Sequence, residues 1–140
     1  MAALLPPTQV HGAVIEIGSI LLRVGIAGEP HPRFIIPVEQ FFSPTSSSDL
    51  AVYQALQGCK APDNSFSSSS SSAVMAPTAA DFRRKLVVMF NRIFLDYLHV
   101  SSKECKVLVI EKLHTPTAIR DGIMTALLKD LQVSSCTSHP

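Results

Sequence analysis

Cysteine is scarce in this sequence, and the three that occur are poorly placed for a covalent framework. Cys59, Cys105 and Cys136 are odd in number, widely spaced and outside any Cys-x-x-Cys pair. A disulfide-stapled secreted domain and a structural zinc site both need paired or regularly spaced cysteines. We therefore expect reduced thiols in an intracellular protein.

Excess charge of one sign and long apolar runs are also missing. The 12 basic residues nearly balance the 11 acidic residues, and the net charge is +1. Proteins that bind nucleic acid or membrane surfaces usually carry a basic excess, so neither partner is expected. No apolar stretch approaches the roughly 20 residues that a membrane-spanning helix needs, and the N-terminus lacks the pattern of a signal peptide. We expect no membrane insertion.

The apolar content is sufficient for one folded unit. The chain has 140 residues, of which 46% are hydrophobic, and this suits a single domain with a core. Aliphatic runs at 13–17 and 20–26, separated by Gly18 and Ser19, predict a β-hairpin. A third short strand is predicted before Pro37, which cannot donate to a sheet ladder. We expect these strands within 13–42, after a flexible N-terminus at 1–12.

Serine dominates the next part of the sequence. Residues 65–72 are almost entirely serine, and the range 43–77 offers little to bury. It is predicted to be a flexible, disordered insertion that tolerates shortening. One or two helical turns are predicted at 50–56.

Helical and strand patterns return at Thr78. A capping box at 78–81 and apolar residues at helical spacing predict a helix to about Leu98. The continuous apolar run Val107–Ile110 predicts a strand buried on both faces of a parallel sheet. A Pro-initiated apolar stripe predicts a second helix over 116–131. The folded part is expected to end at 133, and 134–140 is predicted to be a tail without a finished element.

The first of these helices carries several basic residues on its outer side. Two interpretations are open for this face: a basic docking patch, or a solvated helix surface, which is the commoner case. We assign it no ligand. Its residues are Arg83, Arg84, Lys85 and Arg92.

The segment Val14–Pro37 resembles the opening of actin and the actin-related proteins. In that family an acidic Gly-Ser hairpin is followed by a Gly-x-Ala-Gly turn, then by Pro-Arg and a strand that ends in proline. The order and spacing match without a gap. The matching positions are Gly18, Ser19, Gly25, Ala27, Gly28, Pro32, Arg33 and Pro37.

Two later segments extend the resemblance. Residues 93–111 resemble a helix of the family, its exit loop and a strand that ends in an acidic residue, and 115–133 resemble the helix that follows. The resemblance implies an α/β fold, a partial actin-like (ribonuclease H-like) domain. Its mixed sheet would place Val107–Ile110 parallel to Val14–Ile17, with the free edge of Val107–Ile110 open, and two helices would cover the sheet.

The resemblance also implies a nucleotide site in a degenerate form. In the family this hairpin is a phosphate loop, whose backbone N–H groups face the phosphates, whose acidic residue lies near the metal and whose basic residue contacts phosphate. The corresponding residues here are Glu16, Gly18, Ser19 and Arg23. Ile20 replaces a glycine that would relieve crowding. The alternative is that Gly18 and Ser19 form an ordinary tight turn.

Within the family, the type found at the pointed end of the dynactin complex is the most similar. The resemblance implies a non-catalytic structural subunit in the cytoplasm and cytoskeleton, with other actin-related and dynactin subunits as partners and no required cofactor. The matched segments omit the second phosphate loop, so we expect no ATPase activity. No catalytic or metal-binding residue is assigned. Two alternatives stay open: a nucleotide-binding ATPase of the actin, sugar-kinase and chaperone fold, and a nuclear actin-related subunit of a chromatin-remodelling complex.

Overall fold

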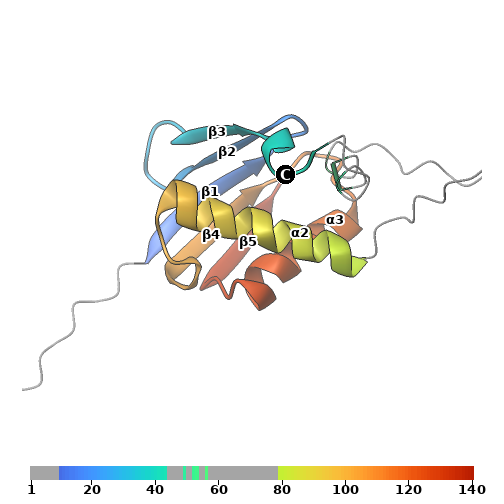
Figure 1. The fold of residues 1–140 in the computed structure, drawn as a ribbon. Coiled ribbons are helices and arrows are strands. Elements are labelled where there is room, and N and C mark those ends of the chain that lie inside the picture. The colour runs from blue at the N-terminus through green and yellow to red at the C-terminus, as the bar shows by residue number, and fades with distance from the viewer. Residues whose placement is uncertain (1–9, 44–48, 50–51, 54–55, 57–78) are drawn as a thin grey trace, which may run out of the picture.

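A mixed sheet of five strands organises the residues that the computed structural model describes, which are 10–43, 49, 52–53, 56 and 79–140. The strand order is β3-β2-β1-β4-β5 (Figure 1). The strands are β1 (His11–Ile17), β2 (Leu21–Ile26), β3 (Phe34–Pro37), β4 (Cys105–Ile110) and β5 (Ser135–His139).

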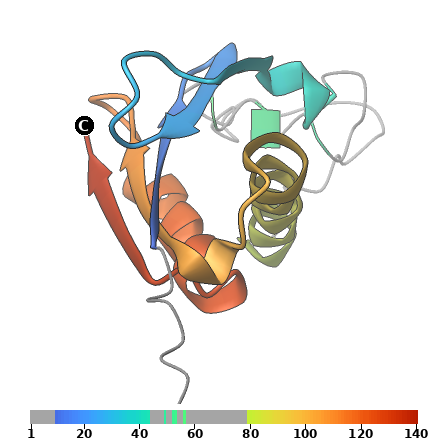
Figure 2. The ribbon, with the colours of Figure 1, turned by 90° about the vertical axis from the view of Figure 1, so that its left-hand side faces the viewer.

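Two helices pack on the same face of this sheet (Figures 1 and 2). Helix α2 (Ala79–Arg92) continues in wider π-helical turns as η2 (Ile93–Leu98) and ends at His99, whose backbone adopts the left-handed conformation typical of a helix C-terminus. Helix α3 (Thr117–Thr125) continues in the same way as η4 (Ala126–Asp130). Both predicted helices are confirmed. Among the described residues, no helix is long and apolar enough to cross a membrane.

The core lies between the helices and the facing side of the sheet. Its apolar residues recur every second position along the strands and every third or fourth position along the helices, as each geometry requires. The short turns η1 (Val38–Gln40) and η3 (Ser102–Glu104) connect these layers. The largest fully buried side chains are Phe42, Phe90, Phe94, Ile15, Leu22, Leu86, Met89, Ile93, Ile123, Leu127, Val24 and Val38.

Strand β1 is central, antiparallel to β2 and parallel to β4. Val14 lies opposite Leu108 and Glu16 lies opposite Ile110, so the predicted parallel pairing of these segments is confirmed. The prediction that β4 is buried on both faces is wrong. Val107 and Val109 are buried, whereas Leu108 and Ile110 are only half-buried. Both helices lie on one face, and a continuous apolar run does not reveal which faces of a strand are covered.

The predicted tail at 134–140 is also corrected, because it contains β5. This strand runs parallel to β4, and α3 forms the crossover between them. The junction is fixed by Ser134, whose N–H and hydroxyl both donate to the Cys105 carbonyl at 2.9 and 2.8 Å. The predicted open edge of β4 is therefore wrong. Among the described residues, the edge strand on this side of the sheet is β5, with the sequence Ser-Cys-Thr-Ser-His.

The described residues include only part of the predicted N-terminal segment and of the predicted serine-rich insertion, so the predicted boundaries can be compared with the structure at a few positions. Strand β1 begins at His11, inside the range predicted to be flexible. Most of 43–77 lies outside the described residues, as do most residues of the helical turns predicted at 50–56. Val52 and Leu56 are described, and both are buried in the core. At least these two residues of the predicted insertion therefore belong to the folded unit.

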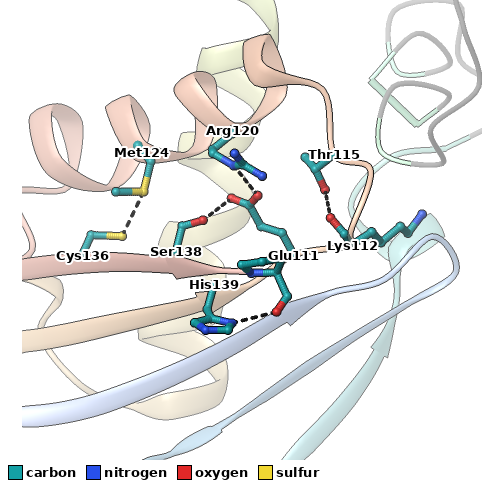
Figure 3. Close-up of polar contacts among 9 residues, drawn as sticks. Glu111, Lys112, Thr115, Arg120, Met124, Cys136, Ser138 and His139 are labelled. Atoms are coloured by element: carbon teal, nitrogen blue, oxygen red, sulfur yellow. Dashed lines mark hydrogen bonds and ion pairs between the residues drawn. The ribbon is translucent and has the colours of Figure 1, made fainter.

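The Cys136 thiol on β5 gives a first test of this arrangement. Its Sγ donates to Met124 Sδ of α3 at 3.5 Å (Figure 3). Burial, with a smaller contribution from the negative charge of Glu111, raises the pKa of Cys136 from 9.0 to about 11. Between pH 9 and about 11 the folded state therefore keeps the thiol proton of Cys136, whereas the unfolded state has lost it. We expect the stabilisation to be complete below pH 9 and lost as the pH rises to about 11.

This prediction is measured by urea unfolding on either side of that pH window. Cys136→Ala removes the titrating group. The free energy of unfolding of this variant should therefore decline less steeply with rising pH than that of the original chain. The pKa of the buried Cys105 thiol is raised too, mainly by desolvation, so part of the decline should persist in the variant. Identical pH profiles for the two proteins would show that Cys136 is not held in the folded sheet.

Candidate functional site

The face of the sheet opposite α2 and α3, called here the outer face, carries a groove. The chain between β2 and β3 folds back over this face, where Gly25 permits a close approach. A Cβ at Gly25 would lie 3.3 Å from Pro32 Cα. The resulting groove has a volume of about 250 Å³. It is lined by Val14, Glu16, Arg23, Ile110 and residues 25–32.

The loop that borders the groove is held by its own polar contacts. The Ala27 N–H donates to the Gly12 carbonyl at 2.7 Å, and Gly28 adopts a positive φ of 94° that favours glycine. Arg33 donates through two nitrogens to the Glu29 carboxylate at 2.6 and 2.9 Å. These hydrogen bonds hold the pKa of Glu29 below its usual value. The wall of the groove is therefore a structured loop.

Glu16 and Arg23, predicted to serve a phosphate loop, face each other across the β1–β2 pair. They occupy directly opposed positions in the register, and Arg23 Nη1 donates to Glu16 Oε1 at 2.6 Å. Both side chains are partly exposed at the groove. The acidic residue expected near a metal and the basic residue expected near a phosphate thus neutralise each other.

Gly18 and Ser19 lie at the hairpin turn and do not line the groove. The Gly18 N–H donates to the Leu21 carbonyl at 3.0 Å. A Cβ at Gly18 would lie only 2.4 Å from that oxygen, so the tight turn requires glycine. Ile20 extends into solvent with 65% of its surface exposed. The four predicted residues are therefore split: one pair meets at the groove and the other forms the turn.

Sequence reasoning missed a second polar centre, at the end of β4. The Glu111 side chain is only 1% exposed, and both of its carboxylate oxygens are engaged. Arg120 of α3 donates to Oε2 at 2.8 Å, and Ser138 of β5 donates to Oε1 at 2.8 Å (Figure 3). The Glu111 N–H also donates to the His139 carbonyl at 2.9 Å. This centre joins β4, α3 and β5 and serves the architecture of the sheet.

The floor of the groove was also missed, because it depends on the register between β1 and β4. Val14 and Ile110 are far apart in the sequence and come together only through that pairing. The glycines and prolines at 25–32 signalled a loop but not its direction. Across the described ranges 10–43 and 79–140, no three His, Cys, Asp or Glu side chains converge in a way that could hold a metal ion.

The chain is similar to an actin-related protein. It is 27% identical over 130 residues to the Actin-related protein 10 of Dictyostelium discoideum, an alignment that covers 86% of this chain. The chain spans about a quarter of the length of that curated relative, since the alignment covers 26% of it. No protein-family model matches the chain. The similarity supports a relation to the actin-related proteins, and the mixed α/β sheet is consistent with a partial actin-like domain.

The pairing at the hairpin leads to a prediction about nucleotides. We expect no saturable binding of magnesium-ATP in the micromolar range. A Kd of about 1 μM would correspond to a binding free energy of about −8 kcal/mol. The Gly18 N–H is used within the turn and Arg23 is engaged by Glu16, so phosphate would have to displace existing hydrogen bonds. Titration calorimetry on the whole chain measures this directly.

The matched variant is Glu16→Gln, which releases Arg23 from its ion pair. If the pairing alone blocks the site, this variant should bind the nucleotide more tightly than the original chain. Saturable micromolar binding by the original chain would contradict the prediction.

Proposed function

We propose that this chain is a non-catalytic structural subunit related to actin, which acts in the dynactin complex at the pointed end of its actin-like filament. In this role it supports microtubule-motor-based transport in the cytoplasm and associates with the cytoskeleton. The observation that carries the proposal is the similarity to Actin-related protein 10, which extends over 86% of the chain. The resemblance of residues 13–37 and 78–133 to actin-related sequences supports the same assignment.

The chemistry of the groove favours a structural role over catalysis. Hydrolysis of a phosphoanhydride needs a positioned water, a metal ion and stabilisation of charge on the phosphoryl group. Of the charged side chains that line the groove, Glu16 pairs with Arg23, and Glu29 pairs with Arg33 of the bordering loop. Groups that neutralise each other are poorly suited to stabilise charge that develops on a substrate.

The outer face is the surface that we propose contacts other subunits. Parallel strands are usually covered on both faces. Among the residues that the structure describes, the helices that cover β1, β4 and β5 lie on one face only. Val14, Leu108 and Ile110 are half-buried on the outer face and would gain burial in a subunit contact. The proposed partners are other actin-related proteins and further dynactin subunits.

Affinity purification of the tagged, full-length chain from cells tests this proposal. We expect dynactin subunits to be recovered with the chain, and we expect the complex to sediment with dynactin in a sucrose gradient. The variant Leu108→Glu places a charge on the outer face and should weaken recovery. The control Asn91→Glu adds the same charge at an exposed position of α2, on the other side of the sheet from the outer face.

The outcome that would overturn the proposal is purification without dynactin or other actin-related subunits. Nuclear localisation with subunits of a chromatin-remodelling complex would instead support the alternative assignment. Circular dichroism of both variants shows whether a loss of recovery reflects a lost contact or a lost fold.

A further inference from the structure

Strand β3 forms an edge of the sheet and is the uppermost strand in Figure 1. Among the described residues, β2 is its one neighbouring strand. An edge strand presents unpaired backbone N–H and C=O groups along its outer side, and native proteins often protect such an edge with charged side chains. The sequence of β3, Phe-Ile-Ile-Pro, carries no charge. This β3 edge therefore lacks that protection.

The hydrogen-bond pattern identifies which backbone groups of β3 point away from the sheet. Directly after β3, the Val38 N–H donates to the Ile20 carbonyl at 2.8 Å, in the same register as the strand pair. Hydrogen-bonded pairs alternate with non-hydrogen-bonded pairs in an antiparallel ladder, so Ile36 bonds to β2 and Ile35 does not. The N–H and C=O groups of Ile35 therefore point outward, away from β2.

Apolar side chains flank the β3 edge on both faces of the sheet. On the outer face, Ile35 is 57% exposed, and Leu21 of β2 is 36% exposed on the same face. On the face that carries the helices, Phe34 is 36% exposed and packs edge-on against Tyr97, with the ring centres 5.4 Å apart. Large exposed apolar side chains that gather at one place are typical of a protein contact.

The edge at the other side of the sheet has different chemistry. Strand β5 reads Ser-Cys-Thr-Ser-His and contributes no large aliphatic or aromatic side chain apart from its imidazole. The Ser138 hydroxyl is already bonded to Glu111. A strand added beside β5 would bury little apolar surface. Of the two edges of the described sheet, β3 is the one that joins outward backbone groups to exposed apolar side chains.

We propose that the β3 edge binds an extended apolar segment of a partner protein, which adds to the sheet as a further strand. The backbone of that segment exchanges hydrogen bonds with Ile35. Its side chains pack alternately beside Ile35 on one face and Phe34 on the other. The outward backbone groups require an extended occupant, and the apolar flanks on both faces select apolar side chains. This binding depends on β3 and its neighbours and not on the proposed function.

A second copy of this chain fits the β3 edge less well. Strand β3 has four residues and passes directly into η1 after Pro37, which has no N–H to donate. Two copies could therefore pair over only a short length. A partner segment can continue past both ends of β3 and contact the apolar side chains on both faces.

The probe is a fluorescein-labelled peptide of alternating valine and isoleucine, with blocked termini and a flanking lysine at each end for solubility. Fluorescence anisotropy with the full chain should show saturable binding. A control peptide carries N-methyl groups on all its valine and isoleucine residues, so it keeps the side chains but cannot donate backbone hydrogen bonds to a strand. It should bind about tenfold more weakly or worse.

Hydrogen exchange followed by NMR locates the bound peptide. In the free chain the Ile35 N–H should exchange rapidly, because it points away from β2. Saturation with the unmethylated peptide should slow its exchange about tenfold or more. The amides of β5 should keep their exchange rates.

Two matched variants distinguish the edges of the sheet. Ile35→Lys places a charge beside the β3 edge and should raise the Kd for the peptide about tenfold or more. Because Ile35 is largely exposed, the fold should tolerate this change. The control is Thr137→Lys, which adds the same charge at an exposed position of β5 and should leave the Kd unchanged. Circular dichroism confirms that both variants are folded.

Several results would overturn the proposal. These are absence of saturable binding, equal affinity for the N-methylated peptide, an Ile35 N–H that stays unprotected at saturation, and an unchanged Kd in Ile35→Lys. Sedimentation velocity on the chain alone tests the second copy. A dimer that Ile35→Lys dissociates would show that the edge pairs with itself, and it would overturn the assignment of a different partner.

Discussion

Val109→Asp is expected to abolish the folded state. Val109 is fully buried in β4, between β1 and β5 and beneath the helices. A carboxylate there would lose its hydration without gaining a partner, which costs several kcal/mol. That cost is comparable to the whole stability of a small domain, about 5–15 kcal/mol. Far-UV circular dichroism and urea unfolding of the variant should show loss of the cooperative transition.

The matched control is Leu108→Asp, a change at the adjacent position of the same strand. Leu108 is on the outer face and only half-buried, so its carboxylate can remain hydrated. We expect this variant to keep a cooperative transition with a smaller loss of stability. Equal losses at the two positions would contradict the one-sided packing of the sheet.

Arg120→Ala should produce the second large effect. The change removes the Arg120 guanidinium from the buried Glu111 carboxylate and leaves the Ser138 hydroxyl as its side-chain donor. Removal of one member of a buried ion pair typically costs about 3–5 kcal/mol, because the other charge stays desolvated. Since Arg120 is itself 39% exposed, we expect a value near the lower limit, about 3 kcal/mol. Urea unfolding at neutral pH measures the difference.

Arg83→Ala provides the control for this experiment. It removes the same type of side chain from an arginine–carboxylate pair between α2 and η4, but the Arg83–Asp130 pair is exposed to solvent. The loss should therefore be small and should shrink further in high salt. If Arg120→Ala lowered the free energy of unfolding no more than Arg83→Ala does, the Glu111 centre would not hold β4, α3 and β5 together.

Much of the architecture could be predicted because its signals are local. The helix from Ala79 to Leu98 follows from a repeat of apolar residues every three or four positions, and the hairpin follows from two aliphatic runs around Gly18. Strand β5 could not be predicted in this way. Its residues Ser-Cys-Thr-Ser-His have neither strong strand propensity nor apolar alternation, and it is held by contacts to β4 and Glu111. Tertiary pairing overrides local preference there.

Two of the four residues predicted for a phosphate loop, Glu16 and Arg23, line the groove, whereas Gly18 and Ser19 do not. The sequence identified Glu16 and Arg23 as charged residues of one hairpin, yet their mutual ion pair depends on the exact cross-strand register. The closeness of Val14, Ile110 and Pro32 depends on a parallel pairing and on a loop that folds back over the sheet. Such distant relations leave no local pattern in a single sequence.

The strand order also has a consequence for how the protein folds. The central strand β1 is at the beginning of the described chain, but its parallel neighbour β4 comes long after the hairpin. During synthesis, β1, β2 and β3 emerge first and can form an antiparallel meander. The edge of β1 that later pairs with β4 is still unpaired at that stage. The hydrophobic layer closes only after α2 and β4 have followed, and such non-local closure slows folding. We therefore expect the sheet to close late in folding, only after β4 as far as Ile110 has been synthesised.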